Sequence, residues 1–341
     1  MKTVFESETG LRHEMGSTHL EAPVRLSLIK TAILESALKP KFKTASPASL
    51  EEIYRVHSKE LVEELQETAL HERTEFTPDT IANRFTWDAA VHAAGGSIQT
   101  AHEAYKKKHT VFAMLRPPGH HATVNAIMGF CFLNNIAIAA ESLIKNEKVK
   151  KVAILDVDNH HGNGTQDIFY HRADVLYASL HASPRFAYPG TGWIEQVGEG
   201  EGIGKTINIP LPYQVQDSPY LTILNELVIP IIQEFNPDIL LISLGLDGLK
   251  NDPYGALGLS TEGFLNIGRS IAQLSKTVKN RIGVFLEGGY KYDEIGEATV
   301  RFFEGLKEGG TPIFEPDYSS SYLDQVLRKS RAIFRKYWTS I

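Results

Sequence analysis

Apolar side chains in the first hundred residues follow the period of an α-helix. Between residues 22 and 38 they recur at every third or fourth position, which places them on one face of an amphipathic helix. The same pattern predicts a second helix over residues 49–65 and a third, rich in alanine, over residues 86–106. The N-terminal part of the chain is therefore predicted to be largely helical.

From residue 110 onward the pattern changes to short runs of consecutive apolar side chains. These runs occupy residues 110–115, 152–157, 174–180, 238–244 and 281–286. Helical patterns separate most of them, over about residues 132–146, 165–172, 218–235 and 261–278. Strands that are apolar throughout and alternate with helices are typical of a parallel sheet buried on both faces. We therefore predict an α/β fold with a central, mostly parallel sheet and helices on both faces.

A polar or glycine-rich cluster follows each of these five predicted strands. In an open parallel sheet the carboxyl ends of the strands meet at one edge, where such sheets bind their ligands. We expect the five clusters to build one site at this edge. They comprise residues 116–121, residues 156–161, His181, Asp247 and residues 288–290.

Nothing in the sequence divides the 341 residues by a repeat, a low-complexity tract or a Pro/Ser-rich linker, and one large α/β domain can reach this length. We predict a single domain over residues 1–341, with its core over about residues 19–310. Apolar side chains at helical spacing predict a C-terminal helical tail over about residues 318–338. We expect this helix to pack on its own domain; a contact between copies of the chain is the alternative.

Bulk composition limits the partners and the compartment. The net charge of −6 and the pI near 6.1 argue against a surface that binds nucleic acid. Cys131 is the only cysteine, which excludes an internal disulfide and fits a reducing compartment. No apolar stretch reaches 18 residues, so no membrane segment is predicted. The expected location is the cytoplasm.

Asp158 and His160 follow the apolar run at 152–157 and are two residues apart, so their side chains share one face of an extended strand. Carboxylate and imidazole groups are ligands for zinc and other first-row dications. No histidine lies beyond His181, so a third ligand from a later strand is not a histidine, and Asp247 is the natural candidate. Two aspartates and one histidine with an open fourth position are typical of a catalytic zinc site, which activates a water and polarises a carbonyl.

Two adjacent histidines, His120 and His121, offer the acid and the base that amide hydrolysis needs. A carboxylate on the second ring nitrogen orients a histidine and raises its basicity. Asp156 can serve one histidine in this way, and His120 is the preferred candidate. Asn163, a neutral amide, is then the expected partner of His121 and would leave it the better proton shuttle near neutral pH. The two histidines should titrate as a coupled pair.

Tyr290 follows two glycines, where the backbone can approach closely and aim the ring inward. A phenol hydroxyl in that place would donate a hydrogen bond to an oxyanion that develops opposite the metal. A Gly-Gly-Tyr turn is common by itself, so this assignment depends on the other clusters.

These motifs together resemble the histone deacetylase family, in its class II-like and bacterial or archaeal branch of acetylpolyamine amidohydrolases and histone deacetylase-like amidohydrolases. The resemblance covers residues 19 to 290 in the family's order, and the two His-His motifs make it specific. It is carried by RPPGHHA (116–122), GFCFLNN (129–135), DVDNHHGNGTQ (156–166), SLH (179–181) and EGGY (287–290).

The resemblance implies the arginase–deacetylase fold and a zinc-dependent deacetylase, a hydrolase that acts on the amide bond of an N-acetylated amine. It matches Asp158, His160 and Asp247 to the ligands of one zinc ion per chain. It matches Tyr290 to the tyrosine that stabilises the transition state. The matching catalytic histidine pair and its aspartate are His120, His121 and Asp156.

Further positions follow from the same resemblance. The walls of a narrow tunnel for the acylated amine correspond to Gly129, Phe130, Tyr188, Gly288 and Gly289. A structural potassium ion is implied at the carbonyls of Asp156, Ser179 and Leu180, and a second near Phe169 and Val175. Arg25 matches an arginine behind the site, and Asn163 matches the asparagine of class II-like members.

Two other functions are alternatives to a deacetylase. A two-manganese ureohydrolase shares this fold by family resemblance, but it would need a carboxylate where this chain has Gly245. A non-catalytic scaffold that binds acetyl-lysine would need neither Tyr290 nor the intact histidine pair. The substrate is open between an acetyl-lysine peptide and an acetylpolyamine; Asp79 is a candidate rim acid for a cationic amine, or else a solvated loop residue. A homodimer or homotetramer is also left open.

Overall fold

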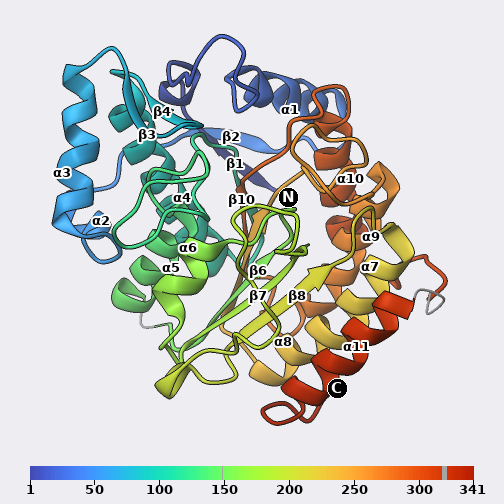
Figure 1. Ribbon diagram of the computed structural model, residues 1–341. Coiled ribbons are helices and arrows are strands. Elements are labelled where there is room, and N and C mark those ends of the chain that lie inside the picture. The colour runs from blue at the N-terminus through green and yellow to red at the C-terminus, as the bar shows by residue number, and fades with distance from the viewer. Residues whose placement is uncertain (148, 317–320) are drawn as a thin grey trace.

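The computed structural model describes residues 1–147, 149–316 and 321–341 (Figure 1). Its main sheet contains β1 (Thr3–Glu6), β2 (Lys41–Thr44), β5 (Thr110–Ala113), β6 (Val152–Asp156), β7 (Val175–Ala182), β8 (Thr206–Leu211), β9 (Ile239–Leu244) and β10 (Ile282–Leu286). The strands lie in the order β2–β1–β5–β10–β9–β6–β7–β8, and each neighbouring pair is parallel. A short antiparallel hairpin, β3 (Thr74–Thr77) and β4 (Thr80–Ala82), forms a separate sheet. The predicted α/β class with a parallel central sheet is confirmed.

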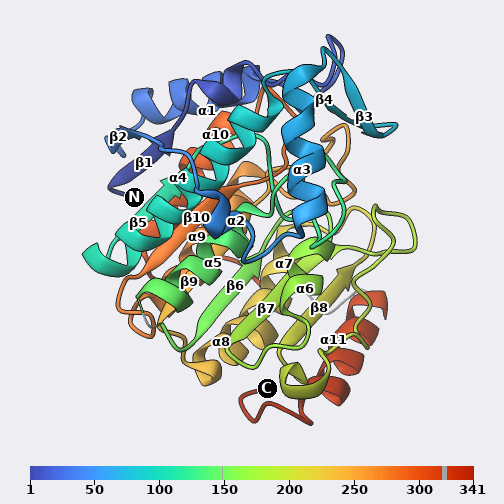
Figure 2. The same ribbon diagram turned by 90° about the vertical axis from the view of Figure 1, so that its left-hand side faces the viewer.

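Helices connect the strands and cover both faces of the sheet. They are α1 (Val24–Glu35), α2 (Leu50–Ile53), α3 (Lys59–Glu67), α4 (Thr86–Lys107), α5 (Asn135–Asn146), α6 (Asn163–Phe169), α7 (Asp217–Ile223), α8 (Ile229–Phe235), α9 (Thr261–Ala272), α10 (Ile295–Glu308) and α11 (Ser321–Phe334). Val152 and Ile154 of β6 pack in the core with α4 and α5, the face turned to the viewer in Figure 2. Ala153 and Leu155 pack in the other core, with α8, α9 and α10. Alternate side chains of one strand thus serve two cores, as expected for a sheet buried on both faces.

Two predicted helices differ from the observed ones. Residues 49–65 form α2 and α3 rather than one helix, because Ser58 leaves the helical path and caps α3, accepting the N–H of Leu61 at 3.2 Å. Residues 218–235 are helical throughout, but a π turn over Leu224–Val228 separates α7 from α8. The π turn lies just before Pro230, which has no N–H to donate to the helix.

Several elements have no counterpart among the predicted ones: β1 to β4 and α10. Strand β2 reads Lys-Phe-Lys-Thr and lies at the edge of the sheet, so four residues with only one apolar side chain show no recognisable strand pattern. Helix α10 contains Gly305, where a Cβ would lie 1.9 Å from the carbonyl oxygen of Leu265 in α9. The glycine lowers helix propensity but permits the close contact between the two helices.

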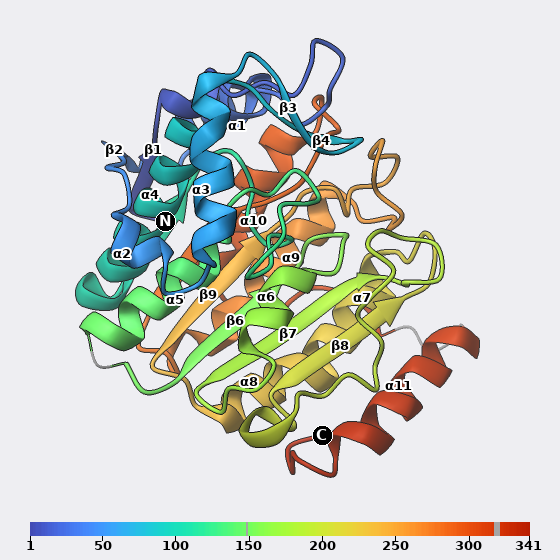
Figure 3. The same cartoon turned by 60° about the vertical axis from the view of Figure 1, so that its left-hand side comes forward.

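The C-terminal helix packs on its own domain, as predicted. Residues 318–320 of the predicted tail lie outside the described residues, and the helix runs over Ser321–Phe334. Leu323 and Phe334 are buried in the core that contains α8 and α9, and Figure 3 shows α11 beside β8, the last strand of the sheet. Trp338 Nε1 donates to the carbonyl oxygen of Gly204 at 2.9 Å. Across the described ranges no helix combines the length and the apolar character needed to cross a bilayer.

Candidate active site

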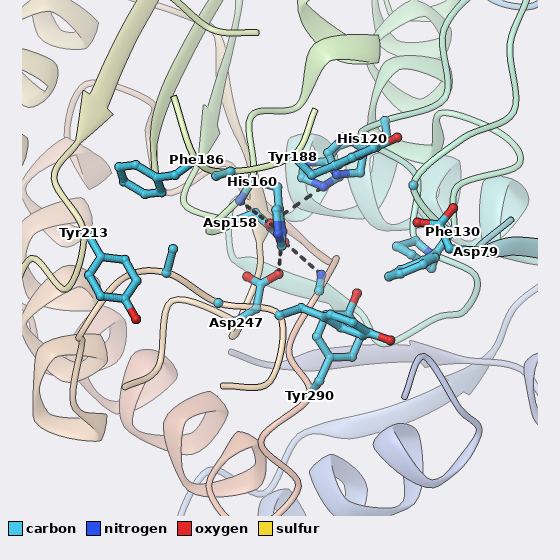
Figure 4. Close-up of a pocket in the computed structure, with 18 residues that line it drawn as sticks. Asp79, His120, Phe130, Asp158, His160, Phe186, Tyr188, Tyr213, Asp247 and Tyr290 are labelled. Atoms are coloured by element: carbon cyan, nitrogen blue, oxygen red, sulfur yellow. Dashed lines mark hydrogen bonds and ion pairs between the residues drawn. The ribbon is translucent and has the colours of Figure 1, made fainter. Parts of the chain in front are cut away.

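Four neighbouring strands supply the residues of one cavity. In the sheet, β5, β10, β9 and β6 lie side by side, and the loops after them carry His120, Tyr290, Asp247 and His160 respectively. All four side chains line a cavity of about 400 Å³ (Figure 4). The prediction that clusters at the strand ends build a common site is confirmed for these four strands.

The fifth cluster does not reach this cavity. His181 lies within β7 and is fully buried. Its Nε2 donates to the carbonyl oxygen of Gly192 at 2.9 Å, and its Nδ1 accepts from Ser179 Oγ at 2.8 Å. Both ring nitrogens are therefore occupied by structural contacts, which hold the loop after β7 against the sheet.

Three side chains converge as candidate metal ligands. One donor atom from each of Asp158, His160 and Asp247 lies within 4.8 Å of the other two. His160 Nδ1 is 3.0 Å from Asp247 Oδ2 and 3.3 Å from Asp158 Oδ1. Backbone groups orient both carboxylates: Gly288 N–H donates to Asp158 Oδ2, and Asn159 N–H donates to Asp247 Oδ1, each at 2.9 Å. The arrangement is fixed by the backbone on both sides.

The chemistry of this group fits a single divalent cation. Asp158 and Asp247 are both completely buried, and burial together with the charge of Asp158 raises the pKa of the Asp247 carboxyl. Two buried carboxylates are costly unless a positive charge offsets them. Position 245 has no room for the carboxylate side chain that a second metal would need. A Cβ at Gly245 would already lie 2.0 Å from Asp158 Oδ2. The residues present therefore fit one ion and not the pair that a ureohydrolase requires.

The two adjacent histidines have the partners that the sequence predicts. His120 Nδ1 faces Asp156 Oδ2 at 3.0 Å, and His121 Nδ1 faces Asn163 Oδ1 at 2.8 Å. Tyr177, a buried residue of β7, donates its hydroxyl to the same Asp156 oxygen at 3.1 Å. One histidine is thus paired with a carboxylate and the other with a neutral amide.

These surroundings move the two pKa values apart. Burial by itself lowers the pKa of His120, but the carboxylates of Asp156 and Asp158 outweigh it and raise the pKa to about 10. Burial lowers the pKa of His121 well below its ordinary value of 6.5, and the positive charges of His120 and His160 lower it further. The coupled pair should therefore titrate in two separate steps.

Glu287 positions this histidine pair, a role that the sequence did not reveal. Its Oε2 accepts the backbone N–H groups of Gly119 at 2.8 Å and His120 at 3.2 Å. Its Oε1 accepts from Ser243 Oγ at 2.9 Å. The signal that could have pointed to Glu287 is its place directly after the apolar strand β10, at the same edge as the other clusters.

Tyr290 is held at its backbone and at its ring. Asp252 Oδ2 accepts the Tyr290 N–H at 2.6 Å, a contact that the sequence did not predict either. The guanidinium carbon of Arg25 lies 5.0 Å from the centre of the Tyr290 ring, and Arg25 Nε donates to the carbonyl oxygen of Gly289 at 2.7 Å. Arg25 therefore packs against the Tyr290 ring and is not among the residues that line the cavity.

Most of the predicted tunnel residues line the cavity. Gly129 has φ +58, and a Cβ there would lie 2.5 Å from His121 Cδ2, so glycine is required beside the ring. The rings of Phe130 and Tyr188 line the cavity, 6.1 Å from the Tyr290 ring and 5.1 Å from the His121 ring respectively. Gly288 and the predicted rim acid Asp79 also line the cavity. Gly289 does not; a Cβ there would lie 2.5 Å from Leu246 Cβ, away from the cavity.

The positions implied for potassium lie at the ends of neighbouring elements. Asp156 pairs with Ser179 across β6 and β7, and Leu180 follows in β7. Phe169 ends α6, and Val175 begins β7. Potassium binding at these positions stays a prediction.

Comparison with known proteins identifies the family. The chain matches the histone deacetylase domain over residues 19–306. It is 40% identical over 301 residues to a probable deacetylase of Archaeoglobus fulgidus, which covers 85% of this chain and 81% of the relative. It is 40% identical over 223 residues to acetylpolyamine amidohydrolase 2 of Pseudomonas aeruginosa, which covers 65% of this chain and 63% of the relative.

A solved structure agrees in fold along nearly the whole chain. The crystal structure of the HDA15 HD domain superimposes with a TM-score of 0.90 at 32% sequence identity, covering 99% of this chain and 95% of that one. Relatives named deacetylase and acetylpolyamine amidohydrolase support deacetylase activity for this chain as well. The chain belongs to the histone deacetylase family.

Proposed function

We propose that this chain is a zinc-dependent amidohydrolase that removes the acetyl group from an N-acetylated amine. The observation that carries the proposal is the convergence of Asp158, His160 and Asp247 with His120 and His121 at one cavity. A zinc ion held by the first three side chains would polarise the amide carbonyl and lower the pKa of a bound water toward 7.

Proton transfer falls to the two histidines. His121 meets only the neutral amide of Asn163 through its Nδ1, so it is free to accept a proton from the attacking water. His120 faces the Asp156 carboxylate, which favours the protonated ring and makes it the source of the proton that the departing amine needs. One histidine thus acts as base and the other as acid.

Tyr290 supplies the hydrogen bond to the oxyanion. Burial raises the pKa of its phenol well above 10, so the hydroxyl keeps its proton at neutral pH and can donate it. Arg25 and Asp252 hold the ring and its backbone in place. A scaffold that only binds acetylated peptides would need neither this donor nor the histidine pair, so we favour an enzyme.

The substrate class is an acetylated alkylamine. An acetyl-lysine side chain and an acetylpolyamine both end in an alkyl amide that the cavity lined by Phe130 and Tyr188 would admit. Relatives are named histone deacetylase and acetylpolyamine amidohydrolase. Asp79 lines the same cavity and offers a carboxylate to the second amine of a polyamine.

Release of acetate from an acetyl-lysine peptide and from an acetylated diamine tests the proposal. We expect the zinc-loaded protein to hydrolyse at least one of them, and a chelator or the Asp247→Asn substitution to abolish turnover. Asp238→Asn is the matched control, because Asp238 precedes β9 at the opposite end from Asp247 and accepts the N–H groups of Lys150 and Lys151. Undiminished turnover by the chelated protein would rule out the proposal.

A further inference from the structure

Two exposed aromatic side chains extend the cavity to one side of the candidate metal ligands. Phe186 and Tyr213 line the same cavity as Asp158 and are 50% and 64% exposed. In Figure 4 they lie to one side of the metal-ligand group, and Asp79 and Phe130 lie to the other. Large rings left open to solvent beside a concave site are typical of a surface that contacts a ligand.

The aromatic pair is preformed. The two rings meet edge to face, with centroids 5.9 Å apart and planes at 90°. Backbone hydrogen bonds fix both loops: Phe186 N–H donates to the carbonyl oxygen of Ser183 at 3.1 Å, and Gln214 N–H, next to Tyr213, donates to that of Ala256 at 2.7 Å. Phe186 and Tyr213 thus form a corner of two perpendicular rings, and a ligand that packs against both would find them already in place.

The corner is uncharged. Within the part of the chain that the structure describes, the charged or titratable acids and histidines lining the cavity are Asp79 and the members of the metal-ligand and histidine groups. Next to the corner the lining residues are Ala187 and Ala256, which present only methyl groups. A cationic group would be drawn to the carboxylate of Asp79 across the cavity. An aromatic ring could instead stack on the ring of Phe186 or Tyr213 and contact the edge of the other.

The position of the corner decides which part of a substrate reaches it. The reacting carbonyl must lie at the buried Asp158 and Asp247 side chains, whereas at least half of the Phe186 and Tyr213 surface is exposed to solvent. The group that leads out of the cavity is the amine side of the amide. We infer that Phe186 and Tyr213 form a subsite for an aromatic ring carried on the amine side of the acetylated substrate. This inference rests on the proposed function and narrows its substrate class.

Matched substrates test it. We would measure kcat/KM for an N-acetyl phenylalkylamine, an N-acetyl alkylamine of the same chain length, and an N-acetyl diaminoalkane. We expect the aromatic substrate to exceed the alkyl one about 10-fold, the size of a favourable ring–ring contact. Phe186→Ala and Tyr213→Ala should each lower this ratio at least about 3-fold, while Tyr213→Phe should keep it. Tyr54→Ala, at an exposed tyrosine outside the cavity, is the control and should keep both rate and ratio.

The possible results distinguish a failure of the aromatic subsite from a failure of the proposed function. Equal kcat/KM for the aromatic and alkyl substrates, with both hydrolysed, would overturn the subsite and leave the proposed function intact. A preference for the diaminoalkane that disappears in Phe186→Ala would overturn it in favour of a cation site. If no acetylated amine is hydrolysed, the proposed function fails. Saturation-transfer NMR on the aromatic amide then decides the subsite: signals that vanish in Phe186→Ala support it, and unchanged signals overturn it.

Discussion

A methyl group added at Gly245 should dismantle the candidate metal site. Gly245 follows β9 at the carboxyl edge of the sheet, two residues before Asp247. The new Cβ of Gly245→Ala would lie 2.0 Å from Asp158 Oδ2 and 2.3 Å from its Cγ, whereas ordinary van der Waals contact begins at 3.4 Å. The Asp158 carboxylate would therefore have to retreat by more than about 1 Å.

This displacement is large for a metal ligand, because ligand distances vary by only about 0.2 Å. Asp158 could not bind the ion from its displaced position, and we expect zinc affinity to fall at least about 100-fold. Crowding should cost about 1–3 kcal/mol in the free energy of unfolding. Competition with a chromophoric chelator measures the affinity, acetate release measures the turnover, and denaturant titration measures the stability.

Gly248→Ala is the matched control in the same loop. A Cβ there meets Leu259 Cδ1 at 3.1 Å and nothing else within 3.4 Å, and the end of a leucine side chain can move. Neither glycine has a positive φ, so each substitution tests space rather than backbone strain. Zinc affinity and turnover should survive in Gly248→Ala. The reasoning is refuted if Gly245→Ala binds zinc and hydrolyses substrate as well as Gly248→Ala does.

Three further predictions each concern one residue. Tyr290→Phe should lower kcat about 100-fold, the usual loss for one oxyanion donor. The control Tyr292→Phe removes a hydrogen bond to a backbone carbonyl outside the cavity and should leave kcat near normal. Equal kcat in both variants would exclude Tyr290 as the oxyanion donor. Glu287→Leu removes the oxygen that accepts the N–H groups of Gly119 and His120. It should lower the free energy of unfolding by about 1–3 kcal/mol and should also lower kcat. An unchanged kcat at saturating substrate would show that Glu287 does not position the histidine pair. Burial lowers the pKa of His57 from 6.5 to about 4, so on acidification the unfolded chain takes up a proton at this residue before the folded chain does. The stability that neutral His57 contributes is complete above pH 6.5 and is lost as the pH falls toward 4. Denaturant titrations at pH 6.5 and pH 4 should show that the free energy of unfolding falls by about 3 kcal/mol less in His57→Gln than in the wild type, and equal falls in the two proteins would contradict the assignment.

The candidate metal ligands and histidines could be read from the sequence because each is local to a strand end. Asp158 and His160 share a face by the two-residue repeat of a strand, and Asp247 follows another apolar run. Parallel strands put such ends on one edge whatever their order. The strand order itself was not predicted, yet it is what places β6 next to β9 and makes the three ligands neighbours.

The residues that hold the site could not be predicted, because their contacts depend on tertiary structure. Glu287 binds the N–H of Gly119 across 168 positions of sequence, and Asp252 binds the N–H of Tyr290 across 38. In the sequence, nothing distinguishes Glu287 and Asp252 from other acidic loop residues, because their contacts form only when the sheet brings the loops together. The same holds for Phe186, whose partner ring lies in a loop beyond the next strand.

Titration of the metal-free protein with zinc, followed by acetate release and by elemental analysis, tests the proposed single-ion site most directly. We expect activity to rise with bound zinc and to saturate at one ion per chain, and we expect Asp247→Asn to gain neither zinc nor activity. Full turnover in protein that holds no metal, or activity that rises until two ions are bound per chain, would contradict a one-metal site built from Asp158, His160 and Asp247.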